Sequence, residues 1–135
     1  MKTMVQIRSA LIEKLKSINE LTLAHVNFPT EIRELTWQGQ DFKYPCVRVG
    51  QIVLTPTNTT CSIATVDGSI MVFSELPSSL EAERLADIIF QALHGHSFSS
   101  GIVIFTGLKC QQFEAVRVPE SAVWQSTIKW SASVS

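Results

Sequence analysis

The sequence lacks an excess of charge of either sign. Its 11 Lys and Arg residues are balanced by 12 Asp and Glu residues, and the basic residues are scattered along the chain. A protein that binds a nucleic acid duplex clusters its Lys and Arg residues on one face, because they neutralise backbone phosphates. The charge pattern therefore argues against duplex binding as the main activity.

Long apolar runs are also missing. No stretch approaches the roughly 18 apolar residues that a membrane-spanning helix needs. The N-terminal residues become amphipathic at once and lack the apolar block of a secretory signal. We therefore expect a protein that is made in the cytosol and contacts no membrane.

Cysteine is scarce, with only Cys46, Cys61 and Cys110 in the chain. Their number is odd, their separations are long, and none forms the Cys-x-x-Cys pair that holds a metal ion. In a reducing compartment we expect all three to be small apolar residues, buried or half-buried.

Motifs of catalytic sites are absent as well. The chain has neither a Gly-x-Ser-x-Gly nucleophile motif nor a glycine-rich phosphate loop. His94 and His96 have the spacing of a metal-binding pair, but zinc sites need three or four ligands and no other Cys or His lies nearby in sequence. We expect both histidines to be solvated at a helix end, where a cationic imidazole suits the helix dipole. The sequence thus predicts no enzyme activity, no metal and no cofactor.

The chain does have the apolar content of one ordinary core. It is 45% hydrophobic and 17% charged over 135 residues. A chain of this length buries about two-thirds of the surface that its unfolded form exposes. We expect a single domain over residues 1–135.

A first helix is predicted over residues 4–18. Thr3 and Gln6 have the spacing of a capping box, and apolar residues then recur every three or four positions. Asn19 is expected to end this helix. Residues 20–43 have no clear pattern, although residues 21–26 are compatible with a short strand.

A second helix is predicted over residues 79–94. Ser78 and Glu81 have the spacing of another capping box, and Gly95 is expected to end the helix. The acids of its first turn favour the positive helix end, so we assign them no role in acid–base catalysis. The apolar face is expected to be buried and includes Leu85, Ile89 and Leu93.

Other segments predict β-strands, namely residues 44–53, 63–73, 102–105, 108–118 and 124–134. In the first of these, Val47, Val49 and Val53 share one face and Arg48 lies on the other. Residues 70–73 are apolar on both faces, so we expect them in the centre of a sheet that is covered on both sides.

Two irregularities are expected within these strands. Asp67-Gly68 is compatible with a two-residue hairpin or with a bulge in one long strand. The apolar alternation shifts between Phe113 and Val118, which indicates a bulge there. The element order is α-β-β-α-β-β-β, which predicts an α+β fold with two principal helices packed against one side of a mainly antiparallel β-sheet.

Five residues are candidates for an interface. Trp37, Phe42 and Trp124 are large aromatic residues that either line the core or anchor a partner. Thr57 and Asn58 lie in residues 55–60, a polar and uncharged segment that predicts an exposed loop.

Two stretches carry a family resemblance. Residues 42–50 read Phe-Lys-Tyr-Pro-Cys-Val-Arg-Val-Gly, a connector that ends in an aromatic-Pro strand. Residues 72–74 read Val-Phe-Ser, and residues 81–95 follow as an Ala-rich helix that ends in Leu-x-Gly. With the N-terminal helix and the closing β-hairpin in the same order, the chain resembles the phage tail-terminator and tail-completion (head–tail joining) family over about residues 4–132.

The resemblance implies a structural virion protein at the neck of a tailed phage, assembled in the host cytoplasm. Such proteins form a ring, typically a hexamer, that seats on the tail tube, ends its polymerisation and joins it to the head–tail connector or stopper protein. Genomic DNA passes through the ring without specific binding. We expect strand edges to contribute to the subunit contacts, and residues 55–60 to face the channel or a partner. The alternatives are a stopper, a baseplate adaptor, a non-catalytic binding module or a small enzyme.

Overall fold

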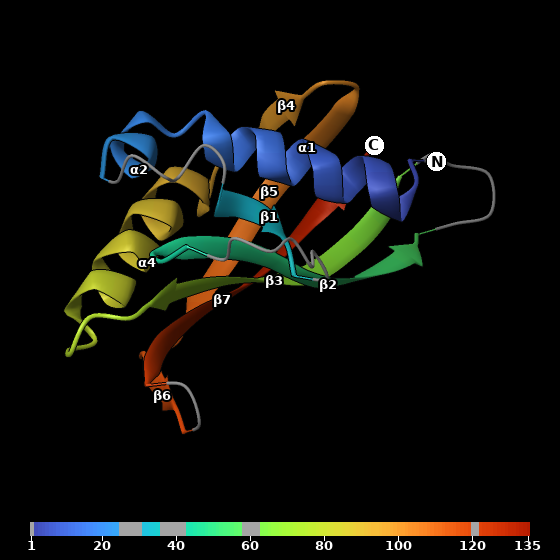
Figure 1. Cartoon of the computed structure of the whole chain (residues 1–135). Coiled ribbons are helices and arrows are strands. Elements are labelled where there is room, and N and C mark those ends of the chain that lie inside the picture. Colours follow the sequence, from blue (N-terminus) through green and yellow to red (C-terminus); the bar gives the residue numbers. More distant parts are fainter. Residues whose placement is uncertain (1, 25–30, 36–42, 58–62, 120–121) are drawn as a thin grey trace.

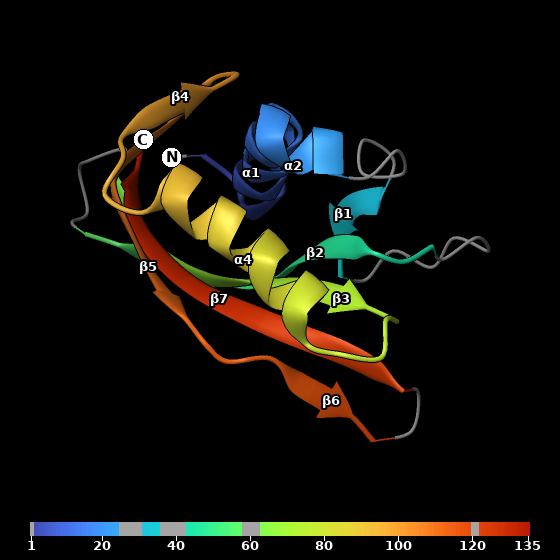
Figure 2. The ribbon, with the colours of Figure 1, turned by 90° about the vertical axis from the view of Figure 1, so that its left-hand side faces the viewer.

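Helices cover one face of a curled β-sheet (Figures 1 and 2). The computed structural model describes residues 2–24, 31–35, 43–57, 63–119 and 122–135. Its elements are α1 (Met4–Lys16), α2 (Asn19–Ala24), β1 (Ile32–Glu34), β2 (Cys46–Pro56), β3 (Ala64–Ser74), α4 (Leu80–Leu93), β4 (Phe98–Ser100), β5 (Val103–Gln112), β6 (Val116–Val118) and β7 (Val123–Val134).

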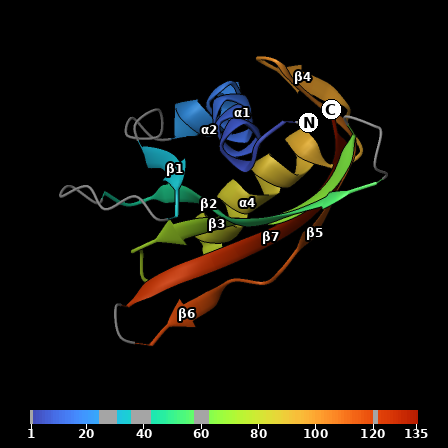
Figure 3. The ribbon, with the colours of Figure 1, turned by 90° about the vertical axis from the view of Figure 1, so that its right-hand side faces the viewer.

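The sheet has the strand order β1-β2-β3-β7-β5-β4, and β6 pairs with the start of β7. All described pairs are antiparallel except β1 with β2. Helix α4 packs on β3, β5 and β7, and α1 packs on β1, β2, β4 and β5. Figure 3 shows both helices on the concave side of the sheet. The predicted α+β class is confirmed, with α2, β1 and β4 as additional elements.

The N-terminal capping box is confirmed. The Thr3 hydroxyl accepts a hydrogen bond from the Gln6 N–H at 3.2 Å, and the Gln6 side chain accepts one from the Thr3 N–H at 2.9 Å. The helix ends earlier than expected, at Lys16, and Asn19 begins α2 instead of ending α1. The short strand considered for residues 21–26 is wrong over residues 21–24, which are helical. Leu21 is buried there, and its backbone N–H donates a hydrogen bond to the Ile18 carbonyl.

Helix α4 buries the predicted apolar face, including Leu85, Ile89 and Leu93. Gly95 follows it with a φ of +77°, a left-handed conformation that favours glycine and confirms the predicted stop. The second capping box is wrong. The Glu81 carboxylate instead accepts a hydrogen bond from the Ser74 hydroxyl at 2.8 Å, so a contact with the preceding strand replaces the local cap.

Asp67 and Gly68 lie in the middle of β3, which pairs with β7 in continuous register. The hairpin interpretation is therefore wrong, and the irregularity lies in the neighbouring strand. The β2–β3 register shifts between Val49 and Ile52, where two residues of β2 face one residue of β3. This bulge turns Ile52 into the core and leaves Val53 exposed, which corrects the predicted face of Val53.

Gly68 permits close packing of the core beneath β3. A Cβ atom there would lie 2.8 Å from Trp130 Nε1 and 2.9 Å from Ile52 Cγ2, closer than real Cβ contacts. We expect Gly68→Ala to lower the free energy of unfolding by about 1–3 kcal/mol through overpacking. Urea denaturation measures this, with Ser69→Ala as the neighbouring control.

A second substitution separates overpacking from other effects of Gly68→Ala. The Trp130 indole N–H is buried with no hydrogen-bond partner among the described residues, so Trp130→Leu removes bulk without breaking a hydrogen bond. The Gly68→Ala change should therefore cost less in a Trp130→Leu background. An equal cost in both backgrounds would contradict the steric explanation.

The last strands differ from prediction in two places. The sequence predicts a buried run over residues 102–105, but only Val103 and Phe105 are buried. Ile104 faces outward in the alternation of β5, and Ile102 is exposed in the turn before it. Residues 108–118 form the end of β5 and the separate strand β6, so the shift in alternation marks a strand break and not a bulge. A register shift does occur earlier in β5, next to Gly107 with its φ of +59°.

The face of the sheet turned away from the helices is polar at its centre. We call this surface the open face; its central side chains are Asp67, Ser69, Lys109, Gln111, Thr127, Lys129 and Ser131. The prediction that residues 70–73 lie in a central strand is confirmed, but the expected cover on both sides is wrong, because the described helices all lie on one face of the sheet (Figure 2). Met71 and Phe73 are only half-buried on the open face, while Ile70 and Val72 are fully buried beneath the helices.

Candidate interaction surfaces

Among the described residues no group of three His, Cys, Asp or Glu side chains is arranged to hold a metal ion. His94 stacks on Phe90 with a ring centroid distance of 4.8 Å, and its Nδ1 accepts a hydrogen bond from the Cys110 N–H at 2.9 Å. His94 and His96 are both exposed just after α4, as the sequence predicts. The His94 imidazole ties the end of α4 to β5.

The described cysteines are unsuited to act as nucleophiles. Burial raises the pKa of the Cys46 thiol to about 12, although the nearby Arg48 guanidinium opposes this shift. Burial likewise raises the pKa of Cys110 to about 11. Because thiolates are the reactive form, both side chains are inert near neutral pH. The prediction of buried or half-buried apolar cysteines is confirmed for these two, and Cys61 lies outside the described residues.

We expect both thiols to resist alkylation in the folded protein. At pH 8 a thiol with the raised pKa of Cys110, about 11, is ionised in only about one molecule in a thousand. Iodoacetamide labelling of a Cys61→Ser variant, followed by intact-mass spectrometry, should show little modification before unfolding and two labels in guanidinium. Labelling of the folded protein at the rate of a free thiol would contradict this.

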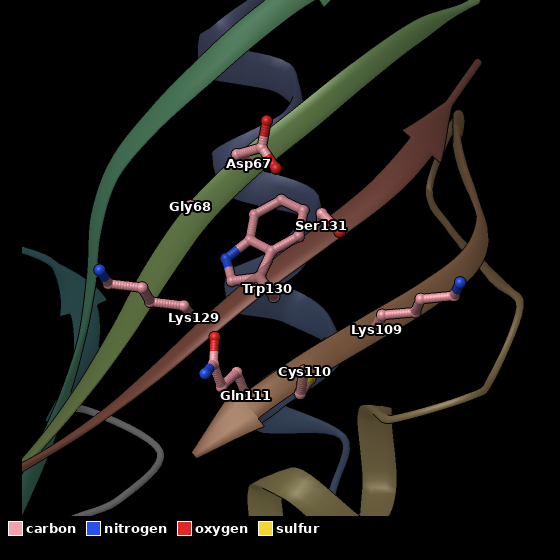
Figure 4. Close-up of a pocket in the computed structure, with 8 residues that line it drawn as sticks. All are labelled: Asp67, Gly68, Lys109, Cys110, Gln111, Lys129, Trp130 and Ser131. Atoms are coloured by element: carbon pink, nitrogen blue, oxygen red, sulfur yellow. The ribbon is translucent and has the colours of Figure 1, made fainter. Parts of the chain in front are cut away.

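The open face holds a shallow hollow of about 380 Å³ (Figure 4). Asp67, Ser131 and Lys109 form one row across β3, β7 and β5. In Figure 4 the Lys109 and Lys129 side chains extend in opposite directions, so their ammonium groups do not converge on one anion. This hollow is a mixed polar surface without a reactive group.

An apolar groove of about 330 Å³ lies between α1 and the turn that joins β4 to β5. Its apolar lining comes from Val5, Ala10, Ile102 and Val103. The Ser100 hydroxyl donates a hydrogen bond to the Ala10 carbonyl at 2.8 Å and holds the two walls together. Val5 and Ile102 are 69% and 65% exposed. We call this surface the α1 groove.

A second apolar surface lies at the start of α4, at the opposite end of the molecule in Figure 1. Leu80 and Leu76 are 68% and 48% exposed there. Trp124 lies at the same end and is half-buried. It pairs in register with Ser74, and the Ser74 hydroxyl donates a hydrogen bond to Glu81 in the first turn of α4. We call Leu76, Leu80 and Trp124 the α4 entry patch.

The predicted interface residues are placed only in part. Trp124 lies in the α4 entry patch, while Thr57 is exposed after β2 and bonds through its hydroxyl to the Ile63 carbonyl at 3.0 Å. Residues 55 and 56 extend β2, so the predicted loop begins later than expected. Trp37, Phe42 and Asn58 lie outside the described residues.

The sequence reasoning missed the α1 groove and most of the α4 entry patch. Residues 102–105 are apolar at every position, so the sequence carries no signal that Ile102 faces outward. For Leu80 the sequence predicts only a place at the start of a helix. Its position outside the apolar stripe of α4 is the signal that it faces outward.

The chain is similar to known proteins in sequence and in fold. The family model described as Tail completion protein gp17 matches residues 9–135. A chain in the solved virion of a native gene transfer agent particle has a similar fold, with a TM-score of 0.77 and 20% sequence identity. The match covers 94% of this chain and 92% of that one. No curated protein matches the chain. No described helix is long and apolar enough to span a membrane.

Proposed function

This chain belongs to the tail completion protein gp17 family, and from that premise we propose that it caps the tail tube of a phage-type virion as a ring. The family makes it a structural protein of a phage-like particle and not an enzyme. In the proposed role the ring, of about six copies by its family resemblance, ends tube polymerisation at the neck and joins the tube to the head connector or stopper protein.

The family match over residues 9–135 is the observation that carries this proposal, because it spans both structural layers of the domain. The gene transfer agent chain of similar fold comes from a virion, which supports a place in such a particle. Ending polymerisation requires no chemistry. It requires one ring surface that fits the last layer of the tube. The opposite ring surface must differ from the end of the tube, so that no further tube subunit binds there.

The uncovered parts of the fold suit passage of DNA through such a ring. The central side chains of the open face are mostly uncharged Ser, Thr and Gln, with Lys109 and Lys129 opposed by Asp67. Thr55 and Thr57 extend the polar surface at the end of β2. We propose that this weakly charged surface faces the channel or a partner, because two lysines on separate strands, with Asp67 beside them, give DNA little electrostatic hold.

The test is assembly on isolated tail tubes that lack this protein. Mass photometry and negative-stain microscopy should detect rings of the purified protein, bound at one end of each tube. Added tube subunits should then fail to extend the capped end. A protein that stays monomeric and binds no tube end would overturn the proposal.

The same experiment separates the alternative roles. A stopper would bind the head connector and leave the tube ends free to grow. A baseplate adaptor would bind the opposite tip of the tail. A monomeric binding module would form no ring under either condition.

A further inference from the structure

We propose that the α1 groove of one copy receives the α4 entry patch of the next copy around the ring. This inference rests on the proposed function and names the contact by which the ring closes. Strand edges are the expected contact, but the outer strands β1 and β4 each have only three residues. β1 pairs with residues 47–49 of β2 alone, so the later part of β2 adds a further open edge, and we infer that side-chain surfaces supply the rest of the contact.

Both surfaces expose large aliphatic side chains that the subunit itself leaves uncovered. Val5 and Ile102 flank the α1 groove, and Leu76 and Leu80 project from the α4 entry patch. Clustered apolar side chains of this kind mark contact sites on soluble proteins. The α1 groove is concave, and the α4 entry patch carries two exposed leucines. The leucines of one copy can therefore pack into the groove of another.

The charges around the two surfaces are complementary. The α1 groove has one charged residue in its lining, Glu13, which lies 3.9 Å from Lys16. Lys14 lies over the Phe98 ring of β4, and residues 2–16 as a whole contain four basic residues and one acidic residue. Residues 75–87, around the α4 entry patch, contain four acidic residues and one basic residue, and no ion pair engages them within the described parts of the chain. Each end therefore attracts the other end of a second copy and repels its own kind.

The placement of the two surfaces favours a ring over a closed dimer. They lie at opposite ends of the molecule in Figure 1, so each copy uses one surface for each of two neighbours. Contacts between unlike surfaces close into a ring when the rotation between copies allows it. If the α1 groove bound an apolar small molecule or an unrelated helix, the acidic residues at the other end of the chain would take no part in binding. A second copy of the chain uses both surfaces.

Two single substitutions test the contact. Ile102→Asp alters the α1 groove and Leu80→Asp alters the α4 entry patch, and both side chains are exposed, so the fold should survive. Leu23→Asp is the matched control, because Leu23 is 85% exposed on α2 and belongs to neither surface. We expect each test variant to lose about tenfold or more of its ring affinity, as central interface residues do. The control should assemble like the wild type.

Mixing the two test variants distinguishes unlike from like pairing. The Leu80→Asp protein keeps an intact α1 groove, and the Ile102→Asp protein keeps an intact α4 entry patch. An equimolar mixture should therefore form a heterodimer, visible by native mass spectrometry with mass-tagged copies, whereas each variant alone stays monomeric. The two Asp side chains repel each other and prevent the heterodimer from closing into a ring.

The outcomes separate this inference from the proposed function. If the wild type forms rings and both test variants do so equally well, the contact is wrong and the capping role stands. If the variants remain monomeric and their mixture yields no heterodimer, the two surfaces do not pair with each other. If the wild type assembles neither alone nor on tail tubes, the capping role itself fails. Circular dichroism of each variant tests whether a loss of assembly comes from unfolding.

Discussion

Replacing Arg48 with Met is expected to lower the free energy of unfolding by about 3–5 kcal/mol, because it leaves a buried carboxylate without its charged partner. Arg48 is only 1% exposed, and its Nη2 lies 3.2 Å from Glu31 Oε1. The guanidinium also donates hydrogen bonds to the backbone carbonyls of Glu31 and Val47. One side chain thus fastens the chain before β1 to β2.

The matched control is the double variant Arg48→Met with Glu31→Leu. An apolar pair of similar volume removes both charges, so the double variant should regain much of the lost free energy of unfolding. Urea denaturation measures this. If the double variant is as unstable as Arg48→Met, the backbone hydrogen bonds of the guanidinium are the larger contribution. If Arg48→Met alone has no effect on stability, the buried ion pair does not hold β1 in place.

Leu93→Ala is expected to lower the free energy of unfolding by about 2–5 kcal/mol, because the shortened side chain leaves a cavity between α4 and the sheet. Leu93 is fully buried in the last turn of α4, where the helix packs on β3, β5 and β7. Chemical denaturation followed by circular dichroism measures the loss. The cost within this range depends on how far the surrounding side chains relax.

Leu23→Ala provides the control for this change. It removes the same atoms from a helical residue that is 85% exposed, so no cavity forms and the expected change is within about 0.5 kcal/mol. Equal losses from the two variants would mean that helix propensity, and not packing of α4 on the sheet, determines the result.

Features that depend on local or periodic signals were predicted correctly. The Thr3 and Gln6 capping box, the apolar stripe of α4 with its stop at Gly95, and the last strand, β7, are all set by residues close in sequence. Such interactions are the same in any fold that contains the segment. The α+β class follows from them, because each apolar face requires a second layer to cover it.

Features that depend on partners distant in sequence could not be predicted. Whether Glu81 caps its own helix or bonds to Ser74 is decided by where β3 ends. Whether Val53 is buried is decided by a bulge opposite Ser69. The burial of Arg48 depends on Glu31, which pairs with it only after β1 joins the sheet.

The candidate interaction surfaces belong to this second group. Ala10 and Ser100 are joined by a hydrogen bond across 90 residues of sequence, and only that contact makes α1 and the β4–β5 turn two walls of one groove. By itself the sequence determined the fold class, the main helix and the absence of catalytic motifs, since these follow from composition and short-range periodicity. Only the tertiary structure decided which apolar side chains remain uncovered, because exposure depends on what the rest of the chain packs against.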